Sequence, residues 1–107
     1  MDTKLKRRAD LTVQSFAYVA GKLAQSGDPL VSTSLYEQIL GEADKHRSAL
    51  RLLQRDVFDF VSECLRSKTL TEARFRRVRD TAAKTTELAQ DAITRIASQY
   101  APRKMAA

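Results

Sequence analysis

One apolar stripe over residues 36–64 constrains the fold more than any other feature of the sequence. Its members follow one another at alternating steps of three and four residues: Tyr36, Ile39, Ala43, His46, Leu50, Leu53, Val57, Phe60 and Cys64. A repeat of about 3.5 residues per turn keeps such side chains on one face of a helix, where they pack against a second helix. The stripe therefore predicts one long helix in a coiled-coil-like arrangement.

Two further segments with helical periodicity flank this stripe. Apolar residues recur at helical spacing over about 3–26 and over about 70–100, and the central helix should span about 30–67. Pro29 interrupts the first pattern and Pro102 stops the last, because proline lacks the N–H group that a helix interior requires. The sequence thus predicts three helices and two short connections.

Capping residues stand at the ends of the expected helices. Gly27 is placed to cap the C-terminus of the first helix. Ser34 and Glu37 have the spacing of a capping box ahead of the central stripe. For the third helix two N-caps remain open, Thr69 or Thr71.

The expected fold is an all-α, three-helix antiparallel bundle formed by a single domain over residues 1–107. The short link near Lys68 forces the second and third helices into a long antiparallel hairpin. The shorter first helix should pack alongside and leave the turn end of the hairpin without a third helix. The sequence leaves open whether residues 1–8 and 101–107 are ordered.

Apolar residues near the turn outnumber those that a two-helix seam hides. Contiguous exposed apolar patches usually mark interaction surfaces. We therefore expect four side chains to form a homodimer interface or the binding face for a partner helix: Phe58, Val61, Leu65 and Phe75. The alternative is that the first helix reaches far enough to cover them.

Basic residues concentrate at the same end of the hairpin. Six of them stand against the single acid Glu72, a local net charge of +5 in a chain of net charge +6: Arg66, Lys68, Arg74, Arg76, Arg77 and Arg79. Such a cluster suits phosphates, an anionic membrane or an acidic protein. Alternatively it is a solvated face on which Arg77 and Arg79 pair with Asp56, Asp59 and Glu63 across the hairpin. A second row, Arg47, Arg51 and Arg55, is expected on the solvated outer face of the central helix.

The ionisable residues do not suggest catalysis. His46, the only histidine, lies far along the stripe from Cys64, the only cysteine, so neither can activate the other. We expect His46 to be a polar residue of the seam that fixes register by hydrogen bonding to Asp91. No catalytic, metal or cofactor site and no small-molecule substrate are predicted.

The favoured function is a non-enzymatic protein–protein interaction module, such as an adaptor, small chaperone or regulatory subunit, that presents its apolar hairpin face to a partner helix and is expected to form a homodimer. The alternative is a non-specific nucleic-acid-binding or architectural protein that uses the basic turn and the basic N-terminal arm. A single cysteine fits a reducing, cytoplasmic setting. No apolar run approaches the roughly 18 residues that span a membrane.

Overall fold

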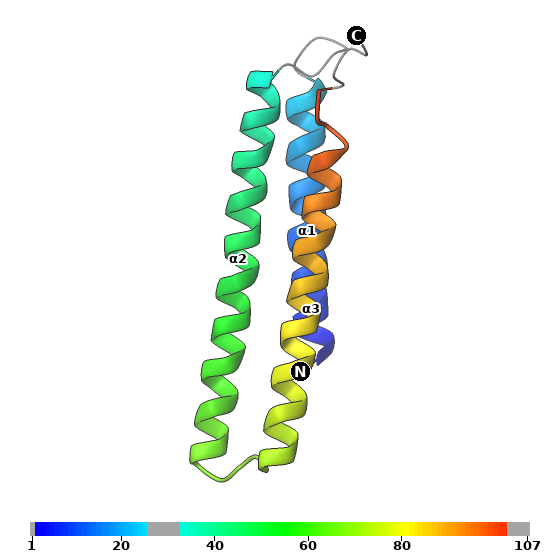
Figure 1. Cartoon of the computed structure of the whole chain (residues 1–107). Helices are drawn as coiled ribbons and strands as arrows, with labels where there is room; N and C mark the ends of the chain where they lie inside the picture. Colours follow the sequence, from blue (N-terminus) through cyan, green and yellow to red (C-terminus); the bar gives the residue numbers. More distant parts are fainter. Residues whose placement is uncertain (1, 26–32, 103–107) are drawn as a thin grey trace.

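The computed structural model describes residues 2–25 and 33–102 and contains three helices over that part of the chain (Figure 1). They are α1 (Asp2–Gln25), α2 (Thr33–Arg66) and α3 (Glu72–Ser98). Each helix packs against the other two in a rod of 61 × 26 × 18 Å. The chain runs up, down and up again, so that α1 and α3 are parallel and α2 is antiparallel to both. The expected all-α three-helix bundle is confirmed.

The helix ends correct several details of the sequence-based expectation. Residues 2–8, whose order the sequence left open, belong to α1. Helix α2 begins at Thr33, so Ser34 lies within its first turn and is not the residue that precedes it. The predicted cap Gly27 and the break at Pro29 lie outside the described residues. Helix α3 ends at Ser98, and Ala101 and Pro102 follow in irregular structure, whereas residues 103–107, whose order the sequence also left open, lie outside the described residues.

The turn between α2 and α3 uses one residue in a left-handed conformation. Lys68 has φ of 61°, and its N–H donates to the Leu65 carbonyl at 3.1 Å while the Thr69 N–H donates to the Cys64 carbonyl at 3.0 Å. This is the hydrogen-bond pattern of a Schellman C-cap, in which glycine is the usual left-handed residue. Thr71 then caps α3 by accepting from the Arg74 N–H at 3.2 Å, which decides between the two expected caps.

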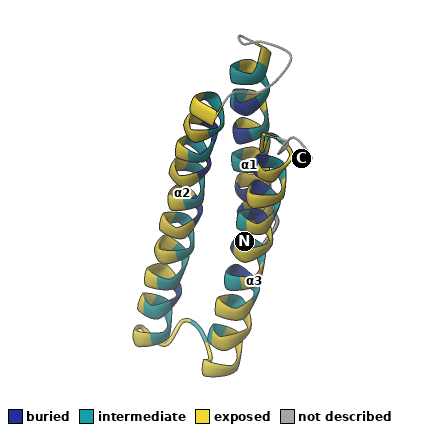
Figure 2. Ribbon diagram, turned by 45° about the horizontal axis from the view of Figure 1, so that its top comes forward, coloured by how far each residue is buried: buried dark blue, intermediate teal, exposed yellow. Residues whose placement is uncertain are grey.

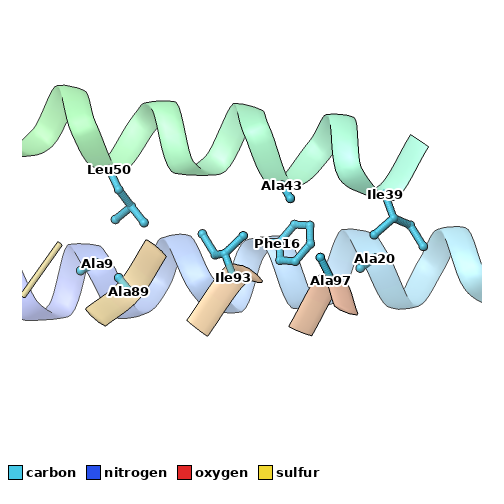
Figure 3. Packing of buried hydrophobic residues seen from close by; sticks show 9 residues of the cluster. All are labelled: Ala9, Phe16, Ala20, Ile39, Ala43, Leu50, Ala89, Ile93 and Ala97. Atoms are coloured by element: carbon cyan, nitrogen blue, oxygen red, sulfur yellow. The ribbon is translucent and has the colours of Figure 1, made fainter. Parts of the chain in front are cut away.

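The central core draws three buried residues from each helix: Ala9, Phe16, Ala20, Ile39, Ala43, Leu50, Ala89, Ile93 and Ala97. Figure 3 shows Leu50 opposite Ala9 and Ala89, and Ile39 likewise opposite alanines of α1 and α3. Between them Figure 3 shows Ile93 of α3 and Phe16 of α1, with Phe16 facing Ala43 of α2. A large side chain in each layer therefore meets small ones, which lets the helix backbones approach closely.

Buried positions recur every eleven residues in all three helices. The repeats are Leu5 and Phe16, Ala9 and Ala20, Ile39, Leu50 and Val61, Ala82 and Ile93, and Thr86 and Ala97. Eleven residues fill three turns at about 3.67 residues per turn, whereas a heptad stripe drifts by about 20° every seven residues on a straight α-helix. The heptad stripe of α2 therefore turns away from the core along the helix towards the turn with α3. Phe60, which the heptad places on the seam, is 53% exposed.

Polar side chains also connect the helices. Thr86 is fully buried, and its hydroxyl oxygen lies 2.8 Å from Oε1 of Gln54 on α2 and 3.0 Å from the carbonyl of Ala82 in its own helix. Arg47 donates to Thr94 of α3 at 3.0 Å and also bonds Asp44. The expectation that Arg47 lies on the solvated outer face is therefore wrong, because its side chain crosses to α3.

The turn end of the hairpin has only two helices. Helix α1 lies beside the other helices over the upper part of the rod and stops before the turn (Figure 1). In α3 no residue before Ala82 is buried, and in α2 none after Val61 is buried. Figure 2 shows the same change, from dark blue within the three-helix part to yellow and teal towards the turn. The expected absence of a third helix at this end is confirmed for the described residues.

Candidate functional site

An apolar groove lies between α2 and α3 at the two-helix end. It has a volume of about 270 Å³ and is lined by side chains of both helices and of the turn: Phe60, Val61, Cys64, Leu70, Arg74, Arg77 and Val78. Phe60 and Cys64 are the last two members of the α2 stripe. The stripe therefore lies outside the three-helix core at this level, and its last two members line the groove.

The four predicted interface residues differ in their exposure. Val61 is only 1% exposed and forms the floor of the groove, so the expectation that it is an accessible anchor is wrong. The helices α2 and α3 are enough to bury Val61, because its side chain faces the space between them. Val61 follows the buried Leu50 by eleven residues and so lies on the same face of α2. Phe58, Leu65 and Phe75 are half-buried and do not line the groove, so the structure does not bring the four predicted residues together there.

The groove also includes hydrophobic residues that the sequence-based site omitted. Phe60 is the most exposed apolar side chain in its lining, at 53%, while Leu70 and Val78 are half-buried. The available signal is the heptad stripe, which continues towards the turn past the level at which the first helix begins. As a seam with the third helix, the stripe predicts Phe60 inside the fold, and the exposure of Phe60 shows that this prediction is wrong.

Three of the six basic residues at this end have acidic neighbours in their own helix. The ion pairs are Arg66–Glu63 at 3.0 Å, Arg76–Glu72 at 3.1 Å and Arg79–Asp80 at 3.6 Å. The Arg79 guanidinium also lies 5.6 Å from the centre of the Phe75 ring. Within the described ranges no ion pair crosses the hairpin, so the expected pairing of Arg77 and Arg79 with acids of α2 is wrong.

Arg74 and Arg77 differ from these three. Both side chains are exposed, both line the groove, and neither forms an ion pair with a described residue. Lys68 is exposed in the turn. The groove thus has an apolar floor and two arginines without acidic partners on its α3 side.

A second groove adjoins the first along α2. It lies between α1 and α2, has a volume of about 320 Å³, and is lined by Lys4, Leu5, Arg7, Arg8, Leu11, Leu53 and Val57. Val57 precedes Phe60 by three residues, about one helical turn, so one apolar edge of α2 passes from this groove to the next. The N-terminal basic cluster therefore faces the same edge of α2 that ends at the turn.

His46 does not pair with Asp91, which is exposed. Its Nδ1 donates to the Glu42 carbonyl at 2.7 Å, its Nε2 lies 3.4 Å from the Ser15 hydroxyl of α1, and its ring centre is 5.6 Å from that of Phe16. The expected register contact is therefore wrong. The stripe faces α1 at this level rather than α3, so the histidine joins α2 to α1.

Other types of site receive no support from the side chains. Among residues 2–25 and 33–102, no three His, Cys, Asp or Glu side chains gather closely enough to hold a metal ion. In the same part of the chain, no helix combines the length and apolar character that crossing a membrane requires. Comparison of the chain with protein-family models, curated proteins and solved structures finds no match.

Proposed function

We propose that the protein is a non-enzymatic protein-binding module whose hairpin end binds a helix of a partner protein in the position that α1 leaves vacant. The observation that carries the proposal is the apolar groove of Phe60, Cys64, Leu70 and Val78. Phe60 continues the edge of α2 whose Leu53 and Val57 line the groove with α1, and α1 itself does not reach the turn (Figure 1).

The fold itself provides a precedent for a helix in this position. Over the upper part of the rod, α1 lies against both α2 and α3 and buries Phe16 against them. Below α1, the continuing edge of α2 presents Phe60 to solvent. A helix docked there would complete the bundle, and recognition of an amphipathic helix by an apolar groove is a common mode of peptide binding.

A second copy of this chain is a less favourable occupant. In a two-fold symmetric dimer the same patch of each subunit meets its copy. Both facing patches would then carry the same positive charge from Arg74 and Arg77, and like-charged surfaces oppose association. A partner helix avoids that repulsion, so we favour it over the homodimer.

Nucleic-acid binding is also less well supported. Arg66, Arg76 and Arg79 already have carboxylates within 4 Å. The groove between the remaining arginines is apolar, whereas a surface that follows phosphates is polar and strongly basic. Titration with random duplex DNA at low salt tests this alternative, because phosphate contacts give a steep inverse dependence on salt.

The test of the proposed function is selection of binders from a displayed library of random helical peptides. Selected peptides are then measured against the wild type, Phe60→Asp and Leu52→Asp. Leu52 is 56% exposed on the same helix and lines neither groove, so Leu52→Asp is a matched control. We expect binding to survive Leu52→Asp and to be lost in Phe60→Asp. Peptides that bind both variants equally, or a library that yields no binder, would contradict the proposal.

A cytoplasmic setting completes the proposal. The single thiol, Cys64, is half-buried in the groove and has no second cysteine in the chain with which to form an internal disulfide. A reducing compartment would keep this wall of the groove free of mixed disulfides.

A further inference from the structure

We propose that the helix bound at the hairpin end is acidic and amphipathic: apolar on the side that enters the groove, and carrying carboxylates that pair with Arg74 and Arg77 and with the basic start of α1. This inference rests on the proposed function and specifies the chemistry of the partner.

The α3 side of the groove supplies the first part of the argument. Arg74 and Arg77 line an apolar surface, and within the described ranges no carboxylate neutralises either of them. Other basic residues nearby do have such partners, as Arg76 has Glu72 at 3.1 Å. Two guanidinium groups left without partners beside an apolar groove favour carboxylates on the molecule that binds there.

The second part comes from α1. Lys4, Arg7 and Arg8 line the adjoining groove, whose α2 wall continues through Val57 to Phe60. A helix that lies in the vacant position therefore has basic residues on its α3 side and at the end that approaches α1. The N-terminus of α1 is the positive end of its helix dipole, and it also attracts carboxylates on a helix bound in this position.

The linings of the two grooves support the same conclusion by their composition. Together they contain five basic residues and no acidic residue. The groove between α1 and α3 differs, because Asp10 accompanies Lys6 there. An uncompensated positive charge is therefore a property of this end of the molecule and not of its grooves in general.

The dimensions limit the bound segment. The part of α2 from Val57 to Arg66 spans about 14 Å at about 1.5 Å per residue, which is two to three helical turns. The partner should present apolar side chains at positions i, i+3 or i+4, and i+7, with Glu or Asp beside them. A segment this short gives few apolar contacts, so the charges should contribute a substantial part of the affinity.

The experiment uses three labelled helical peptides of about 18 residues that share one apolar face and differ only in their flanking residues, which are all Glu, all Gln or all Lys. Fluorescence anisotropy measures their binding to the full chain at low and at physiological ionic strength. We expect the order Glu, Gln, Lys from tightest to weakest, and a loss of the difference as salt screens the exposed charges. Equal binding of the three peptides would overturn the inference.

A charge reversal identifies the protein side of the contact. Arg74→Glu with Arg77→Glu should weaken the Glu peptide about tenfold and strengthen the Lys peptide relative to the wild type. The control, Arg55→Glu with Lys84→Glu, changes the net charge equally at exposed positions that line neither groove and should leave both affinities within about twofold. Equal effects of the two double variants would show that only net charge matters and would overturn the assignment.

The outcomes separate this inference from the proposed function. Gln and Glu peptides that bind equally, and lose binding in Phe60→Asp, would retain the helix-binding groove and refute the acidic partner. Binding of no peptide, or binding unaffected by Phe60→Asp, would refute both. A concentration-dependent dimer in sedimentation equilibrium that Phe60→Asp dissociates would assign the groove to a second copy and overturn the acidic-helix proposal.

Discussion

Replacing Leu50 and Phe60 separately by alanine tests the account of the core. The two residues belong to the same heptad stripe and would contribute similarly if that stripe were the seam. In the structure Leu50 is fully buried opposite Ala9 and Ala89, whereas Phe60 is 53% exposed. The eleven-residue repeat therefore predicts very different losses of stability.

The expected magnitudes follow from burial. Large-to-alanine changes in cores cost about 2–5 kcal/mol, and Leu50→Ala should cost about 3–4 kcal/mol because the neighbouring alanines are too small to fill the cavity. Full burial of a phenylalanine contributes about 1.5–3 kcal/mol, so Phe60, covered over about half its surface, should lose about 1 kcal/mol. A domain of this size has about 5–15 kcal/mol of stability, so both variants remain folded.

Urea denaturation followed by circular dichroism at 222 nm measures both losses, with unchanged m-values as the check on two-state unfolding. Losses of equal size for the two variants would refute the eleven-residue account and restore the heptad seam down to Phe60.

Three further predictions concern local structure. Thr71→Ala should cost about 1 kcal/mol through loss of the N-cap, whereas Thr71→Ser, which keeps the capping hydroxyl, should cost less than half as much; equal losses in urea denaturation would contradict the cap assignment. Gly41→Ala should stabilise by about 1 kcal/mol, since an added Cβ meets no atom within 4 Å, and a lower thermal midpoint would contradict this. Thr86→Val should cost about 1 kcal/mol by removing the contact with Gln54, and the same change in a Gln54→Leu background should cost less; equal costs in a double-mutant cycle would show that the two side chains are not coupled.

The sequence was sufficient to predict the architecture. Helical periodicity and the short link at Lys68 specify three helices and an antiparallel hairpin, because these features depend on local spacing and chain length. The absence of a third helix at the turn follows in the same way, since the first segment is shorter than the second. No distant contact has to be known for either conclusion.

The contacts between helices could not be predicted in the same way. Positions spaced at 3.5 and at 3.67 residues per turn coincide over one or two heptads and separate only further along, so the heptad stripe predicts the burial of Leu50 correctly and that of Phe60 wrongly. Equal sequence distance from the turn predicts that His46 faces Asp91, but facing residues depend on the rotation of each helix as well as on its length. Its hydrogen-bond partner on α1 depends on that rotation.

The candidate site was therefore predicted in part. Its location at the turn and its basic character were expected, and both follow from composition along the chain. Which arginines lack an acidic partner was not predictable from spacing, because Arg76 pairs with Glu72 one turn away whereas Arg77 does not pair with Asp80, which is also one turn away. That difference lies in side-chain geometry.

Protection of Cys64 measures occupation of the groove most directly, because this single thiol lines it. The rate of its reaction with an aromatic disulfide reagent is followed with increasing amounts of the Glu, Gln and Lys peptides. The account predicts that the Glu peptide slows the reaction at the lowest concentration and that Arg74→Glu with Arg77→Glu abolishes this advantage. A Cys64 reaction rate that no peptide changes, at concentrations where anisotropy shows binding, would place the bound helix elsewhere and contradict the account.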